Sequence, residues 1–397
     1  MAFRPIPNSE IIIDNIRYKF TEHPMAKGMP YGQTGRRATI YQLVSNNLSL
    51  HALKVFTKAF RSPEYGNSLE AFRQISKIPG MQVCERSIIT AAQNQKLIEQ
   101  FPEIRFAVLM PWVDGETWFD IIFSRKPLTP YTSLEIARAL SQTLSALEEK
   151  EIAHCDLSGP NLIINTNQVP SIALVDLEEM YSPFMTCPEK LPSGTSGYAH
   201  SSVSHGIWEP TADRFSAAIL FAEILGWSNA NVRMNAYGDH FFSQNNIQQN
   251  TERYQLLLSV LKDQWSSKIA DLFAQAWESK SLAECPSMLE WKNAIEILIV
   301  RSEERLDTSL DEKSLLVNTL LGRASEKERE GNVHGAMVDY QEILKLSQPG
   351  DAIFVEAGII LEDIMQKLSV NHLEHLPSWR PLVDHDFDRL RSNPKEQ

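Results

Sequence analysis

Residues 152–164 read IAHCDLSGPNLII and place three polar side chains, His154, Asp156 and Asn161, among apolar residues. The Asp follows the His by two positions and precedes the Asn by five. Apolar residues on both sides predict a loop that is held between two buried segments. The spacing makes this stretch the first candidate for a catalytic loop.

Further candidates lie on both sides of this loop in the chain. Residues 171–181 read SIALVDLEEMY, which predicts a short strand that ends near Asp176. Upstream, residues 38–44 and 50–56 are β-forming runs joined by the turn-like SNNLS, and the second run carries Lys54. Each feature alone is more often structural than catalytic. Their order, followed by a glycine-bearing segment and a hydrophobic helix, favours a single functional site.

The pattern H-x-D-x-x-x-x-N, with these flanking residues, resembles the protein kinase superfamily, as a divergent bacterial-type Ser/Thr kinase. Ser158 also makes the loop similar to that of RIO kinases. The resemblance implies that Asp156 is catalytic and accepts the proton of the attacking hydroxyl. Asn161, also assigned to the catalytic set, and Asp176 would bind Mg²⁺ against the phosphates of ATP. Lys54 would contact those phosphates.

The resemblance also implies residues at the phosphate end of the nucleotide site. The partner of Lys54 is predicted to be Glu70, with Glu64 as the alternative. The loop before the second strand aligns poorly with the glycine-rich kinase loop; the residues at or near its glycine positions are Gly28, Gly32, Gln33, Gly35 and Ala38. Its backbone N–H groups can still bind phosphate, and Arg36 and Arg37 can add charge. An ordinary flexible loop is an equally good interpretation.

Residues 106–118, FAVLMPWVDGETW, are similar to the kinase hinge that binds adenine. They predict a buried strand that ends in an extended segment at Pro111. Met110 would lie at the rear of the adenine pocket. Because proline has no N–H, the hydrogen-bond donor to the base would be the Val113 N–H. The nucleotide-binding residues that the resemblance implies are Lys54, Glu70, Gly32, Gly35, Met110, Val113 and Asp176.

The fold class that the resemblance implies is α+β: a bilobal protein-kinase-like fold with a C-terminal α-helical extension. The predicted domains are a small β-rich lobe with the hinge (1–113), a helical lobe (114–300) and the extension (301–397). Residues 132–150 show helical spacing and begin with a capping-box signature, Thr132 and Glu135. A later hydrophobic helix begins near Asp213, whose carboxylate should accept backbone N–H groups of the loop. Asp213 is therefore expected to be structural.

Departures from the family pattern are informative. The usual buried Glu–Arg ion pair maps to Ser202 and Cys285, so both partners are neutral together. Losing only one partner would cost about 3–5 kcal/mol, and the paired loss therefore supports the alignment. Cys155 replaces an Arg that senses phosphate in many kinases, so we expect no requirement for phosphorylation within residues 182–198. The D-F-G motif reads D-L-E, with Glu178 last.

From Val300 the sequence becomes charged and helical, beginning with a solvated linker-like stretch. Small and aromatic residues then follow the spacing of one tetratricopeptide-like hairpin: Gly331, Ala336, Tyr340 and Leu344. A helical hairpin packed on the preceding lobe is at least as good an interpretation. We expect these helices to bind a regulatory partner or a protein substrate, and we expect the residues from Asn393 onward to be disordered.

The amino-acid composition restricts the class of protein and its location. With 43% hydrophobic and 22% charged residues, and no apolar run of the length that a bilayer requires, we expect a soluble protein that does not insert into membranes. The net charge of −12 argues against nucleic acid as the main partner. Four scattered cysteines and no apolar leader favour free thiols, no zinc site and a cytoplasmic location.

The function that these residues predict is transfer of the γ-phosphoryl group of Mg-ATP to a Ser or Thr hydroxyl of a protein. One alternative is a pseudokinase scaffold that recruits partners through its C-terminal helices. The degraded glycine loop favours it, whereas the joint presence of Lys54, Asp156, Asn161 and Asp176 opposes it. A second alternative is a kinase that acts on a small molecule.

Overall fold

A computed structural model of the chain describes residues 3–66, 69–167, 169–203, 205–236, 238, 240–347 and 352–370. Side chains at positions 70, 303–315, 318, 352 and 366–370 are outside this description. The fold is mixed α+β. Contacts divide the chain into two units, Met1–Val300 and Arg301–Gln397, and the described residues form separate hydrophobic clusters in each.

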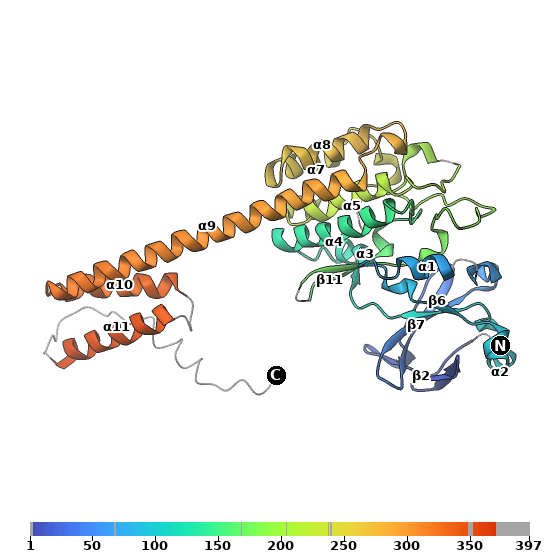
Figure 1. The fold of residues 1–397 in the computed structure, drawn as a ribbon, viewed down its shortest axis with the longest axis horizontal. Coiled ribbons are helices and arrows are strands. Elements are labelled where there is room, and N and C mark those ends of the chain that lie inside the picture. The colour runs from blue at the N-terminus through green and yellow to red at the C-terminus, as the bar shows by residue number, and fades with distance from the viewer. Residues whose placement is uncertain are drawn as a thin grey trace. The chain divides into compact units, whose positions relative to one another are not determined.

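A curled antiparallel sheet of seven strands forms the N-terminal part of the first unit (Figure 1). Its order is β1 (Glu10–Ile13), β2 (Ile16–Phe20), β6 (Ala38–Ser45), β7 (Leu50–Phe56), β9 (Val108–Pro111) and β8 (Ser87–Ile88), with β5 (Gly32–Thr34) also paired to β6. Outside this sheet are the hairpin of β3 (Glu22–His23) and β4 (Ala26–Pro30) and the helices α1 (Leu69–Ile75) and α2 (Ala91–Gln100).

Residues 11–20 read IIIDNIRYKF, which predicts one entering strand, but the structure forms a hairpin of β1 and β2 here. Asp14 and Asn15 have φ values of 51° and 64°, and two left-handed residues in a row are typical of the type I′ turn that joins antiparallel strands. The Asn94 side chain holds this turn: its Oδ1 accepts from the Asp14 N–H at 2.9 Å, and its Nδ2 donates to the Asp14 carboxylate at 2.8 Å. The single-strand prediction was wrong because it overlooked this turn pair.

Strand β7 is central in the sheet and places Lys54 on its inner face. In register, Lys54 pairs with Ile40 of β6 and with Val108 of β9. Side chains alternate between the two faces of a strand. Lys54 therefore shares a face with Ala52 and Phe56, which belong to the hydrophobic cluster that continues into the helical part. The strand thus directs the Lys54 side chain toward the helices.

The rest of the first unit is mainly helical. Its helices are α3 (Trp118–Ser124), α4 (Pro130–Glu148), α5 (Arg214–Gly226), α6 (Ala230–Met234), α7 (Glu252–Gln264), α8 (Ser267–Glu278) and the beginning of α9 (Met288–Arg329). The buried helix α5 packs against α4, α7 and α8 (Figure 1). A small antiparallel sheet, β10 (Glu116–Thr117), β11 (Leu162–Asn165) and β12 (Ser171–Leu174), carries the two loops with the candidate acidic residues.

Helix α4 begins earlier than the sequence predicts. The capping residue is Thr129 and not Thr132, because the Thr129 hydroxyl accepts the Thr132 N–H at 3.0 Å. Pro130 occupies the first helical position, where the missing N–H has no cost. The predicted box of Thr132 and Glu135 therefore lies inside the helix.

The second unit contains the end of α9, α10 (Val333–Leu346) and α11 (Ala352–Val370). Gly331, with φ of 75°, lies in the turn after α9. Ala336 and Tyr340 are fully buried, while Leu344 is half-buried and Ile343 replaces it in the core. The linker-like stretch after Val300 is part of α9, because its Glu, Lys, Arg and Leu residues favour helix. The prediction for residues 393–397 lies outside the described residues.

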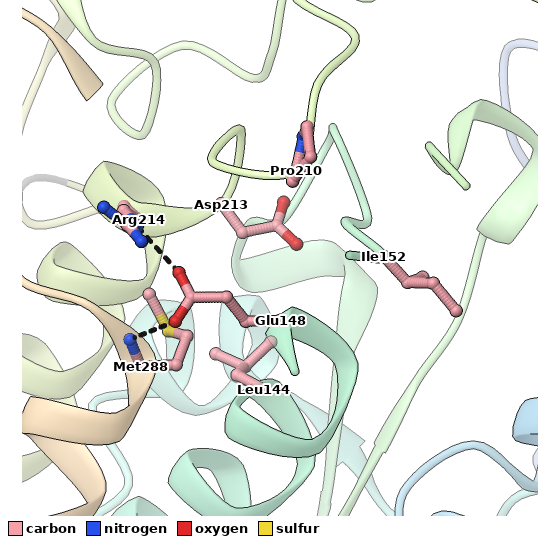
Figure 2. Close-up of a pocket in the computed structure, with 7 residues that line it drawn as sticks. All are labelled: Leu144, Glu148, Ile152, Pro210, Asp213, Arg214 and Met288. Carbon is pink, nitrogen blue, oxygen red and sulfur yellow. Dashed lines mark hydrogen bonds and ion pairs between the residues drawn. The ribbon is translucent and has the colours of Figure 1, made fainter. Parts of the chain in front are cut away.

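Glu148, at the end of α4, joins three helices (Figure 2). Its carboxylate accepts from the Arg214 Nε of α5 at 2.7 Å and from the backbone N–H of Met288 in α9 at 2.8 Å. Asp213 and Ile152 line the adjoining cavity of about 10 Å³, roughly the space of a single water. This place is therefore a structural junction and too small for an organic ligand.

We expect Glu148→Ala to lower the free energy of unfolding by about 1–3 kcal/mol, because two charge-assisted hydrogen bonds are lost. The midpoint of urea denaturation at unchanged slope measures this loss. Glu149→Ala is the matched control, since Glu149 is the exposed neighbour on the same helix end. Equal stability of the two variants would show that the junction contributes nothing.

Candidate functional site

Asp213 fixes the start of the loop between α4 and β11. The residue occupies the N-cap position of α5, yet its carboxylate accepts the backbone N–H of His154 at 2.5 Å and of Cys155 at 2.9 Å. Cys155 has a left-handed φ of 63°, a conformation that is costly for most side chains and persists where its surroundings hold it. The predicted contact between Asp213 and this loop is confirmed.

Asp156 and Asn161 lie together in the same loop. The Asn161 Nδ2 donates to the Asp156 backbone carbonyl at 2.8 Å and to its Oδ2 at 3.4 Å. The other carboxylate oxygen, Oδ1, accepts from the Thr195 hydroxyl at 2.8 Å. Burial raises the pKa of the Asp156 carboxyl, and the hydrogen bond from Thr195 opposes this effect. Asp156 is thus a largely buried carboxylate that already accepts a hydroxyl.

Val175 connects this loop to Asp176. Its N–H donates to the Asn161 carbonyl at 3.0 Å, and its carbonyl is 2.8 Å from the His154 Nε2. Asp176, directly after it, has a left-handed φ of 63°. These backbone contacts therefore place the Asp176 segment beside the loop that carries Asp156.

Lys54 forms an ion pair with Asp176, so the structure brings together the two residues on which the predicted nucleotide site depends. Burial opposes ionisation of Asp176, but the charge of the nearby Lys54 ammonium outweighs this effect and lowers the pKa of the carboxyl far below its usual range. Burial also disfavours the charged Lys54, and the two carboxylates outweigh it and raise the pKa of the ammonium. Both groups are therefore charged at neutral pH.

Four residues that sequence reasoning did not assign to the site also contact it. Glu178 binds Lys54 and Arg86, Thr195 binds Asp156, and Glu179 forms an ion pair with Arg37. One local pattern in the sequence pointed to Glu178 and Glu179: the acidic run D-L-E-E, which follows a buried strand. Arg86 and Thr195 gave no local signal, since their partners are far away in the chain.

The glycine-bearing loop reaches the site through Arg37. Gly32 lies in β5, where a Cβ atom would approach the Ile40 carbonyl oxygen to 2.5 Å, so close strand packing explains this glycine. The Gly35 N–H donates to the Ala38 carbonyl at 2.9 Å and closes the turn. Among the described residues, no hydrogen bond joins either glycine to Lys54 or Asp176, and their binding role stays a prediction.

The hinge residues lie at the end of β9. Met110 is buried and pairs with Ala52, its neighbour in the sheet. The Trp112 N–H donates to the Leu50 carbonyl at 3.1 Å. Over the described part of the chain, the Val113 N–H has no hydrogen-bond partner. Its predicted role as the donor to adenine stays a prediction. Glu70 lies in α1, and its side chain is outside the described residues.

A neutral hydrogen-bond network joins Ser202 and Cys285, where the family pattern has an ion pair. The His200 Nδ1 is 2.7 Å from the Ser202 hydroxyl, and its Nε2 is 3.2 Å from the Ser279 hydroxyl. The Ser279 hydroxyl lies 3.1 Å from the Cys285 Sγ. Burial lowers the pKa of His200 and favours its neutral form. Uncharged groups thus connect the two segments that an ion pair would connect.

Glu223, in the middle of α5, is a buried carboxyl. It accepts from the Trp118 Nε1 at 2.8 Å and from the Tyr198 hydroxyl at 3.0 Å, both at Oε2. Burial raises the pKa of Glu223 to about 7, against the effect of these donors. The folded protein therefore holds a proton on Glu223 at pH values where the unfolded chain has released it.

We expect stability to fall as the pH rises from about 4.5 to 7, because only the unfolded chain ionises Glu223 in this range. The contribution is complete below pH 4.5 and lost above 7, up to about 3 kcal/mol at about 1.4 kcal/mol per pKa unit. Glu223→Gln should remove this decline. Urea denaturation at several pH values measures it, and an unchanged pH dependence in the variant would contradict the assignment.

The sequence matches no protein-family model and no curated protein. No described helix combines the length and apolar character that a membrane crossing requires. Within the same residues, no three His, Cys, Asp or Glu side chains gather as they would around a structural metal ion. The function must therefore be inferred from the arrangement of Lys54, Asp156, Asn161 and Asp176.

Proposed function

We propose that this protein is a protein kinase that transfers the γ-phosphoryl group of Mg-ATP to a Ser or Thr hydroxyl of a protein. The proposal includes a bilobal kinase-like arrangement, with the sheet as the small lobe and the helices of the first unit as the large lobe. The nucleotide would bind between Lys54 and the hinge at Met110 and Val113. Location in the cytoplasm, and partner binding through the C-terminal helices, stay predictions.

The observation that carries the proposal is the ion pair of Lys54 with Asp176, beside the loop of Asp156 and Asn161. Lys54 comes from β7 and Asp176 from the end of β12, 122 residues later. A cation for phosphate, a carboxylate for metal and a carboxylate for proton transfer are the three charged groups that protein kinases use. Their convergence from distant segments favours one site over three isolated structural residues.

The metal-binding residues fit Mg²⁺, which prefers oxygen ligands and usually takes only one or two from the protein. Asp176 offers a carboxylate that remains ionised. Asn161 uses its Nδ2 for the hydrogen bonds to Asp156, so its Oδ1 is the atom that it can offer to the metal. When bound, the ion would neutralise charge on the phosphates.

Asp156 would act on the attacking hydroxyl. The hydroxyl oxygen forms a bond to the γ-phosphorus, the bond from that phosphorus to the bridging oxygen breaks, and ADP leaves. The hydroxyl proton passes to the Asp156 carboxylate. The Thr195 hydroxyl, which donates to Oδ1 at 2.8 Å, supports this role, because the carboxylate accepts a hydroxyl at the distance that proton transfer requires.

The test is phosphate transfer from radiolabelled ATP to generic protein substrates, with wild type and Asp176→Asn compared. Transfer by the wild type that is lost in the variant supports the proposal. Nucleotide binding without transfer to any acceptor would favour the pseudokinase. Transfer that occurs only to small hydroxyl compounds would favour a small-molecule kinase.

A further inference from the structure

Glu178 is a buried carboxylate that lies between two buried cations. Its Oε2 is 2.5 Å from the Lys54 Nζ, and its Oε1 is 3.2 Å from the Arg86 NH1. The side chains of Glu178, Lys54 and Arg86 are only 10%, 6% and 3% exposed. Pairs so deeply buried are strongly destabilised when one partner is removed, whereas exposed pairs contribute little.

Arg86 has further contacts that fix its position independently of Lys54. Its Nε donates to the Val83 carbonyl at 2.8 Å, and its guanidinium lies 4.8 Å from the centre of the Phe72 ring. The planar guanidinium is therefore held on two sides. Glu178 thus remains anchored by Arg86 even when the Lys54 side chain moves.

The two carboxylates around Lys54 differ in their exposure. The Asp176 side chain is 37% exposed, and it can turn to a metal ion when nucleotide binds, whereas Glu178 is enclosed. Once Asp176 binds a cation, Lys54 needs another carboxylate that keeps its ammonium charged and directed to the phosphates. Glu178 is in contact with Lys54, and its ion pair with Arg86 keeps it in place.

We propose that Glu178, held by Arg86, is the positioning residue that directs Lys54 to the nucleotide phosphates. The inference rests on the proposed function and names Glu178 for the role that the sequence assigned to Glu70. The acidic residue would thus come from the segment after β12 and not from helix α1. One short segment would then position both Asp176 with its metal ion and Glu178 with Lys54.

The experiment measures the affinity of full-length protein for ADP with Mg²⁺ and for adenosine, by titration calorimetry. Glu178→Gln should weaken ADP binding about 10–100-fold, the range found when a residue that orients a metal ligand is lost. Adenosine binding should stay unchanged, because adenosine has no phosphate for Lys54 to contact. A general structural defect would weaken the binding of both ADP and adenosine. Glu178→Asp should restore part of the ADP affinity.

Two further variants complete the test. Arg86→Gln with Glu178→Gln removes both charges together, so it should fold where a single variant does not, and it should still bind ADP weakly. Glu70→Gln tests the rival partner. Loss of ADP affinity in Glu70→Gln with none in Glu178→Gln would overturn the inference and leave the kinase proposal intact. A wild-type protein that binds neither ADP nor adenosine would overturn the proposed function itself.

Discussion

Asp156→Asn should lower the turnover number for phosphate transfer about 10²–10⁴-fold, the usual contribution of a positioned general base. The variant keeps the size of the side chain and can still accept the hydrogen bond from Thr195, which is 2.8 Å away in the structure. It cannot take up the proton of the attacking hydroxyl. Because Lys54 and Asp176 are unchanged, the affinity for Mg-ATP should change little.

Steady-state kinetics with varied ATP separates the two effects, since a loss confined to the chemical step lowers turnover and leaves nucleotide binding intact. Asp271→Asn, which alters an exposed carboxylate on α8, is the matched control and should keep full activity. A turnover number within a factor of a few of wild type would remove Asp156 from the catalytic role.

The central elements of the fold were predictable because their signals are local. The β-forming residue types in residues 50–56 and the helical spacing in residues 132–150 identify β7 and α4, and the hydrophobic run after Asp213 identifies α5. The hairpin of β1 and β2 was missed because its turn depends on two consecutive left-handed residues, Asp14 and Asn15. Asp and Asn are among the residue types that favour such positions, so the sequence held a turn signal that the prediction of one strand overlooked.

The candidate site was predictable only where its residues follow a fixed spacing. Asp156 and Asn161 belong to one short motif and contact each other, and Asp176 follows a short buried strand. Glu178 and Arg86 are 92 residues apart, and Thr195 is 39 residues from Asp156. Such pairs form only when the sheet and the helices pack together, and no local pattern records them.

Asp213→Ala should lower the free energy of unfolding by about 2–6 kcal/mol, because the two buried N–H groups of His154 and Cys155 lose their acceptor at about 1–3 kcal/mol each. Phosphate transfer should fall with it, since these residues precede Asp156 and their backbone sets its direction. Urea denaturation measures the first effect, and activity below the unfolding transition measures the second. Asp271→Ala, at an exposed position, is the control. A loss below about 1 kcal/mol would mean that other contacts hold the loop.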